Sequence, residues 1–156
     1  MSLRFRFTLA TAAVALLSVS ASSSLRAQGK TENAKSLRCT FPLNATGNWN
    51  AAGSPDAAVK QTKLVLRFES INTDEGSAEL KNGSVGTGIT VQLASGNLHF
   101  IQSFRSGPLY LTTVFNKESS NGKLKAVHSR HEYLKVPLEG ATSSPEQYYG
   151  ECEIAN

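Results

Sequence analysis

The chain has 156 residues, with 16 Lys and Arg against 12 Asp and Glu, and 40% of its residues are hydrophobic. Residues 1–27 hold three of the arginines and no acidic residue, so the remaining chain carries 13 basic and 12 acidic side chains. A net charge of +1 on that part gives no electrostatic reason to expect binding to nucleic acid or to an anionic membrane. Its 129 residues suffice for one domain with its own core.

The first 27 residues have the three-part pattern of a secretory signal peptide. Arg4 and Arg6 precede an apolar run, and small residues follow it up to Ala21 and Ala27, two alternative cleavage sites of which we favour the later. The run has about a dozen residues, whereas a bilayer requires roughly 20. We therefore expect a bacterial protein that is exported to the periplasm or the medium and is not stably inserted in a membrane.

The exported part shows the period-two alternation of strands with one buried face. Leu64, Leu66 and Phe68, for example, alternate with polar residues, and Ser95-Gly96-Asn97 is one of several turn sequences between such runs. Eight strands are expected near residues 37–43, 63–71, 77–81, 88–94, 97–104, 109–116, 123–134 and 147–154. Residues 28–36 are predicted to be a flexible tail, 44–62 and 135–146 to be long loops, and 54–58 to form at most a short helical turn.

The two cysteines predict how these strands close. Cys39 lies on the apolar face of the first strand and Cys152 on the last strand, and export favours their oxidation to one disulfide. A disulfide requires the two strands to be neighbours or nearly so. We therefore expect residues 37–156 to form one all-β domain, a small antiparallel eight-stranded up-and-down barrel closed by the disulfide, with a β-sandwich as the alternative.

The stretch from Ala126 to Tyr133 contains the candidate site residues. On a strand, His128 and Arg130 point to one face, whereas His131 and Tyr133 point to the other. One strand therefore cannot easily direct both histidines at one metal, and a metal site would need carboxylates or His99 from other strands. The simpler expectation is that one histidine is exposed and the other is hydrogen-bonded in or near the core. We take all four residues as candidates for ligand binding and predict no metal or other cofactor.

No coherent catalytic set is visible in the sequence. His128 and Ser129 are neighbours that point apart, there is no Gly-x-Ser-x-Gly elbow, and the cysteines are expected to be oxidised. Trp49, in the predicted loop 44–62, is a further ligand-binding candidate because it could close one end of an aromatic-lined barrel. The sequence thus favours a binding protein over an enzyme.

Strand number, export and a single disulfide together resemble the calycin-like barrels, which include the lipocalins, the avidins and small bacterial inhibitors of secreted metalloproteases. No motif carries functional residues over, since Gly47-Asn48-Trp49 falls after the predicted first strand rather than near it as the lipocalin Gly-x-Trp does. The leading hypothesis is a secreted non-catalytic binding module with a small apolar ligand or a protein partner of the envelope. The alternatives are a protease inhibitor that inserts the tail 28–36, and a metal-dependent or hydrolytic enzyme centred on His128 and His131.

Overall fold

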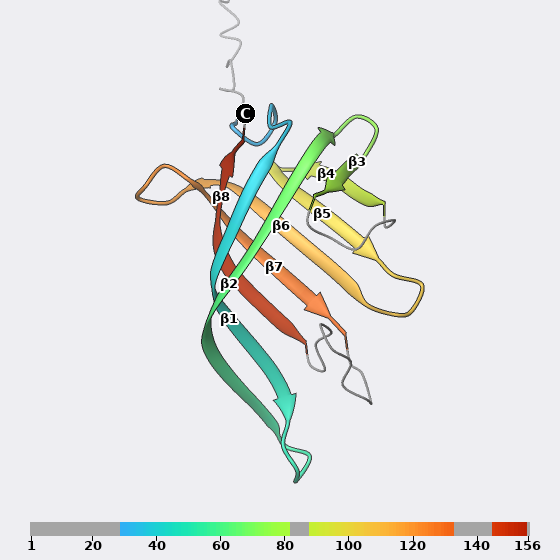
Figure 1. Ribbon diagram of the computed structural model, residues 1–156, viewed down its shortest axis with the longest axis vertical. Helices are drawn as coiled ribbons and strands as arrows, with labels where there is room; N and C mark the ends of the chain where they lie inside the picture. Colours follow the sequence, from blue (N-terminus) through green and yellow to red (C-terminus); the bar gives the residue numbers. More distant parts are fainter. Residues whose placement is uncertain (1–28, 82–87, 133–144, 156) are drawn as a thin grey trace, which may run out of the picture.

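The computed structural model describes residues 29–81, 88–132 and 145–155, and eight antiparallel strands account for most of them (Figure 1). The predicted signal peptide, residues 1–27, lies outside the described residues. The strands are β1 (Leu37–Trp49), β2 (Pro55–Asn72), β3 (Ser77–Leu80), β4 (Ile89–Ala94), β5 (Asn97–Ser103), β6 (Leu109–Glu118), β7 (Leu124–His131) and β8 (Glu146–Ile154). All eight lie where the alternation predicts a strand.

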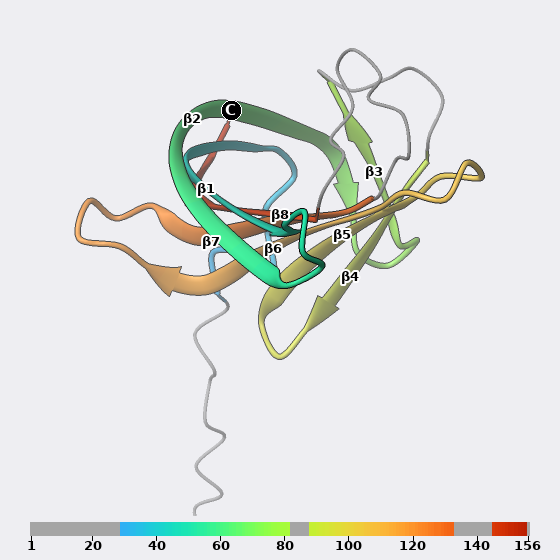
Figure 2. The same ribbon diagram turned by 90° about the horizontal axis from the view of Figure 1, so that it is seen from below.

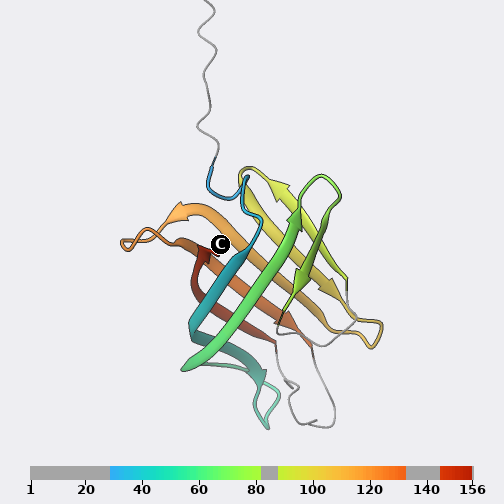
Figure 3. The same cartoon turned by 45° about the horizontal axis from the view of Figure 1, so that its top comes forward.

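The strands pair in chain order and β8 returns to pair with β1, so they form one ring-like sheet rather than the two sheets of a sandwich (Figures 2 and 3). The β4–β5 turn has positive φ at both Ser95 and Gly96, as the predicted hairpin requires. Between β3 and β4, Ser77 pairs with Thr90 and Ala78 with Ile89, and the amide of Val91 donates to the carbonyl of Gly76 at 2.8 Å.

The prediction of a loop at 44–62 is wrong. β1 continues to Trp49 and β2 begins at Pro55, so most of this range is a long hairpin. Residues 55–58, where a short helical turn was expected, are the first residues of β2. Past Thr46, β1 no longer pairs with β8, and the hairpin extends beyond the ring (Figure 1). Its side chains are mostly exposed on both faces, which explains why no alternation marked it as strand. Most of the predicted loop 135–146 lies outside the described residues.

The predicted disulfide is confirmed. Cys39 and Cys152 are directly opposite each other in the β1–β8 ladder, and both side chains are fully buried. They belong to an apolar core that fills one half of the ring, where the rings of Phe68 and Phe100 stack with centroids 4.0 Å apart. Because these large side chains occupy the space between the strands, this half of the ring is packed with protein.

Residues 29–36 are packed against the ring, unlike the flexible tail predicted for 28–36. Thr31 is fully buried and its hydroxyl donates to the carbonyl of Gly96 at 2.5 Å, while Ala34 belongs to the apolar core. The amide of Ile71 donates to the carbonyl of Lys35 at 3.0 Å. This segment therefore covers the apolar end of the ring, at the top of the view in Figure 1.

A bulge in β1 exchanges the faces of two side chains. The register shifts between Phe41 and Leu43, so Leu43 turns outward and Asn44 becomes fully buried. This corrects the predicted strand 37–43, in which Leu43 shared the inner face with Phe41. Pro42 lies at the shift, as expected for a residue that cannot donate to the ladder. Gly150 of β8 lies next to this bulge of β1, and a Cβ at position 150 would overlap the backbone of Thr40 and Phe41.

Candidate functional site

The half of the ring away from residues 29–36 has a polar inner face. Four neighbouring strands contribute two rows of inward side chains that are paired by the ladder registers. The first row is Thr112, His128, Tyr148 and Asn44, and the second is Tyr110, Arg130, Glu146 and Thr46, from β6, β7, β8 and β1 in that order. We call these eight residues the inner polar array. Because strand residues alternate between faces, every second position of four strands is enough to build it.

His128 is buried at the centre of this array, with 2% of its surface exposed. Its Nε2 accepts the Nε–H of Arg130 at 3.3 Å, so its proton is on Nδ1, which donates to the hydroxyl of Thr112 at 2.8 Å. Burial, with a smaller effect of the Arg130 charge, lowers the pKa of His128 to about 3. The imidazole is therefore neutral near pH 7, both nitrogens are occupied, and the residue holds Arg130 rather than acting as a base.

Arg130 lies between two tyrosine rings. Its guanidinium carbon is 5.3 Å from the ring centroid of Tyr110 on one side and 5.3 Å from that of Tyr148 on the other. The hydroxyl of Tyr110 donates to Glu132 at 3.1 Å and that of Tyr148 donates to Glu146. These bonds hold both rings against the guanidinium, which forms no ion pair within the described part of the chain.

The two tyrosines stay protonated far above neutral pH. Burial, and then the hydrogen bond to Glu146, raises the pKa of Tyr148 to about 12. Burial and the nearby Glu132 carboxylate also raise the pKa of Tyr110. Both hydroxyls are therefore donors under ordinary conditions, and the Glu132 and Glu146 carboxylates are their acceptors.

Asn44 supplies the one buried side-chain donor of the described residues that lacks a partner. Its Oδ1 accepts the hydroxyl of Thr46 at 2.8 Å, but Nδ2 reaches no acceptor although the residue is fully buried. Such a group costs about 1–3 kcal/mol and is uncommon in folded proteins. It marks a place where an acceptor from outside the protein would be stabilised.

An opening of about 260 Å³ lies beside the second row of the array. Thr46, Arg130 and Glu146 of the array line it. The other lining residues are their strand neighbours and two residues of adjoining segments: Ala45, Gly47, Ser129, His131, Gln147, Ala57 and Pro145. The volume fits a molecule of about ten non-hydrogen atoms rather than a long acyl chain, at roughly 20–25 Å³ per atom for ordinary packing density. The opening is thus next to the second row of the inner polar array, at the end of the ring that carries the long hairpin.

The candidates from the sequence fall into two groups. His128 and Arg130 face the ring interior together, as the alternation indicates. His131 points outward and is exposed; it lines the opening of about 260 Å³ and, with Trp49 and Pro145, a neighbouring shallow pocket of about 460 Å³. Trp49 is 57% exposed at the end of β1, beyond the part of this strand that pairs with β8, and the Gly47-Asn48-Trp49 sequence lies inside β1 rather than after it. Tyr133 lies outside the described residues.

Most of the array was not identified from the sequence. Tyr110 and Tyr148 were visible only as aromatic residues on strands, and Glu146 preceded the predicted last strand by one position. Asn44 was assigned to a loop because the bulge conceals its inward position, although Pro42 inside an alternating pattern was a possible signal for that bulge. Within the described residues, no three His, Cys, Asp or Glu side chains are grouped so that they could hold a metal ion.

Comparison of the chain with models of known families, with characterised proteins and with solved structures finds no match. In the part of the chain that the structure describes, no helix has the length and apolar character needed to cross a membrane.

Proposed function

We propose that this protein is an exported, non-catalytic binding module, an up-and-down barrel of calycin-like type that holds a small polar molecule at the inner polar array. The observation that carries the proposal is the Nδ2 of buried Asn44, which has no partner among the described residues, in the same array as an Arg130 guanidinium that forms no ion pair with any of them. The signal-like start of the sequence and the disulfide support export to the periplasm or the medium.

The charges beside the opening indicate the chemistry of the ligand. Arg130 offers a cation and Glu146 a carboxylate, and both line the opening with the hydroxyl-bearing Thr46. A molecule with an acceptor group for Arg130 and Asn44 and a donor group for Glu146 complements this set. A short zwitterion, such as an amino acid or a small peptide, has both groups and fits the available volume of about 260 Å³.

Other features speak against the remaining hypotheses. The small apolar ligand we expected would need apolar space, but the apolar half of the ring is filled by side chains such as Phe68 and Phe100. The inhibitor hypothesis needs a free N-terminal segment, whereas residues 29–36 are packed on the ring. For an enzyme centred on His128, the neutral imidazole with both nitrogens engaged provides no base.

The test is ligand binding by protein purified from its own host and by the recombinant protein. Native mass spectrometry of the host protein, compared with denaturing conditions, should show a bound mass of a few hundred daltons or less, the size that the opening of about 260 Å³ admits. A panel of amino acids, dipeptides, simple carboxylates and simple amines is then screened by ligand-observed NMR against the recombinant protein.

Arg130→Gln removes the guanidinium while keeping a polar side chain, and the matched control Arg67→Gln changes an exposed arginine on β2. We expect binding to be lost in the first variant and retained in the second. A host protein without a bound mass, combined with a recombinant protein that binds no member of the panel, would overturn the proposal. So would binding that Arg130→Gln leaves unchanged.

A further inference from the structure

The outer face of the ring carries apolar side chains where the alternation should place polar ones. Leu43, Tyr149 and Val127 are directly paired across β1, β8 and β7, and all three point outward. Leu43 does so because of the bulge in β1, and Tyr149 is 41% exposed. A contiguous apolar stripe across three strands is a feature of interaction surfaces rather than of ordinary solvent-exposed sheet.

This stripe is part of the floor of a groove of about 950 Å³. Phe115 of β6 extends the floor, and the register shifts between Val114 and Glu118 where the β6–β7 hairpin leaves the ring. In Figure 1 this hairpin, drawn in orange, projects sideways from the sheet. The groove therefore lies between the projecting hairpin and the outer faces of β8 and β1.

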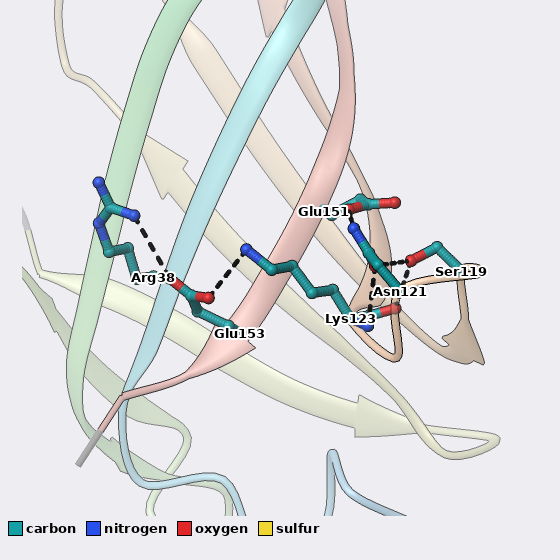
Figure 4. A network of polar contacts seen from close by, with 6 residues as sticks. All are labelled: Arg38, Ser119, Asn121, Lys123, Glu151 and Glu153. Carbon is teal, nitrogen blue, oxygen red and sulfur yellow. Dashed lines mark hydrogen bonds and ion pairs between the residues drawn. The ribbon is translucent and has the colours of Figure 1, made fainter.

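The side of the groove formed by the hairpin is basic. Lys117, Lys123 and Lys125 line it with a single acidic residue, Glu151. Nζ of Lys123 is 2.9 Å from a carboxylate oxygen of Glu153, which also pairs with Arg38; Figure 4 shows both contacts. Those two hydrogen-bonded ion pairs lower the pKa of Glu153, so its negative charge persists into acid.

Glu151 is also engaged, because it accepts the side-chain amide of Asn121 at 2.8 Å, and this bond lowers its pKa (Figure 4). Lys117 and Lys125 form no ion pair with any described residue. Lys125 lies opposite Glu151 in the β7–β8 ladder, and its charge contributes to the lowered pKa of that carboxylate. Three lysines against one glutamate nevertheless leave the lining of the groove with an excess of positive charge, beside a floor that contains two aromatic side chains, Phe115 and Tyr149.

We propose that this groove binds an acidic segment of a partner protein, whose apolar side chains cover the stripe and whose carboxylates meet Lys117 and Lys125. Charge complementarity selects this occupant, since a second copy of this chain would bring its own lysines to the basic side. Aromatic residues with basic neighbours are typical of protein interfaces. The groove and the inner polar array lie on opposite faces of β7 and β8, so each can be altered without the other.

The test is site-specific photo-crosslinking in the organism that makes the protein. Benzoylphenylalanine replaces Tyr149 in the groove and, as the control position, Val59, which is 67% exposed on β2 and outside the groove. We expect a discrete adduct only from position 149, with the linked peptide identified by mass spectrometry as an acidic segment of another protein.

Charge reversal decides whether the basic side recognises that segment. Lys117→Glu with Lys125→Glu should lower the yield of the adduct by about tenfold, whereas Lys60→Glu with Lys63→Glu on β2, both exposed, should leave it unchanged. An adduct with a second copy of the chain or with lipid would overturn the proposal, as would an equal adduct from position 59 or no adduct from position 149. So would an adduct yield that Lys117→Glu with Lys125→Glu leaves unchanged. Circular dichroism and an intact disulfide establish that each variant is folded.

Discussion

Arg130 donates its Nε–H to Nε2 of His128, two residues earlier on the same inner face of β7, at 3.3 Å. This bond fixes the tautomer of the imidazole and places the guanidinium between the rings of Tyr110 and Tyr148. Burial disfavours the protonated imidazole, and the positive charge of Arg130 disfavours it further by repulsion. His128 is therefore a positioning residue for the only cation of the inner polar array.

The low pKa of His128 predicts that the protein loses stability in acid. The unfolded chain binds a proton to this residue below about pH 6.5, whereas the folded protein does so only near pH 3. His128 should therefore lower the free energy of unfolding by up to about 1.4 kcal/mol per pH unit as pH falls from 6.5 towards 3, and not above 6.5.

The measurement is urea unfolding at a series of pH values for the wild type, His128→Gln and His131→Gln. Glutamine at position 128 does not titrate but still offers an acceptor and a donor. Since Arg130, Glu132, Glu146, Tyr110 and Tyr148 surround the site in all three proteins, the difference between proteins isolates the histidine. Exposed His131 is the control, and an acid slope that persists in His128→Gln would show that other groups cause it.

Gly150 should be intolerant of any side chain. A Cβ at this position would overlap the backbone of Thr40 and Phe41, and backbone cannot move aside as a flexible side chain can. We expect Gly150→Ala to lower the free energy of unfolding by about 2–4 kcal/mol. Gly47→Ala is the control because nothing lies within 4 Å of its Cβ position. Equal effects of the two substitutions would mean that the bulge of β1 can shift.

The disulfide closes a segment with a sequence separation of 113 between its ends. In the chain-entropy model such a cross-link stabilises the folded protein by roughly 4–5 kcal/mol, by restricting the unfolded chain. Cys39→Ala with Cys152→Ala should lower the midpoint of urea unfolding accordingly, and reduction of the wild type should have nearly the same effect. Unchanged unfolding after reduction would contradict the expectation.

Residues 29–36 should contribute to stability as part of the core. Ala34 is 3% exposed, so Ala34→Asp would bury a charge and should lower the free energy of unfolding by about 2–4 kcal/mol. Asn33→Asp places the same side chain at the neighbouring exposed position and should change it by less than about 0.5 kcal/mol. Hydrogen exchange offers a second measurement, since the amide of Ile71 should be protected by the carbonyl of Lys35.

Replacing Asn44 by an apolar residue should change the free energy of unfolding of the ligand-free protein very little. Asn44→Leu removes the unpartnered Nδ2 together with one hydrogen bond from Thr46, so we expect stability within about 1 kcal/mol of the wild type. Thr112→Val, in contrast, leaves buried His128 without an acceptor and should cost about 1–3 kcal/mol. A large loss in Asn44→Leu would show that its amide is satisfied in the free protein.

The strand pattern was predictable because alternation is local. The spacing of Leu64, Leu66 and Phe68 indicates a half-buried strand without any knowledge of its neighbours in space. All eight predicted strands are present. The pairing of Cys39 with Cys152 was predictable for a similar reason, since a chain with two cysteines has one intramolecular pairing. The long hairpin within residues 44–62 was missed because both of its faces are largely exposed, which leaves no alternation to detect.

The candidate site was only half predictable. The opposite faces of His128 and His131 follow from strand geometry, and the sequence indicated them. The sequence by itself determined an all-β chain with a single disulfide, because side-chain period and cysteine number are properties of the chain alone. Only the tertiary structure decided that Asn44 faces inward, that Leu43 faces outward and that Arg130 lies between Tyr110 and Tyr148, because each depends on the register between strands that are distant in sequence.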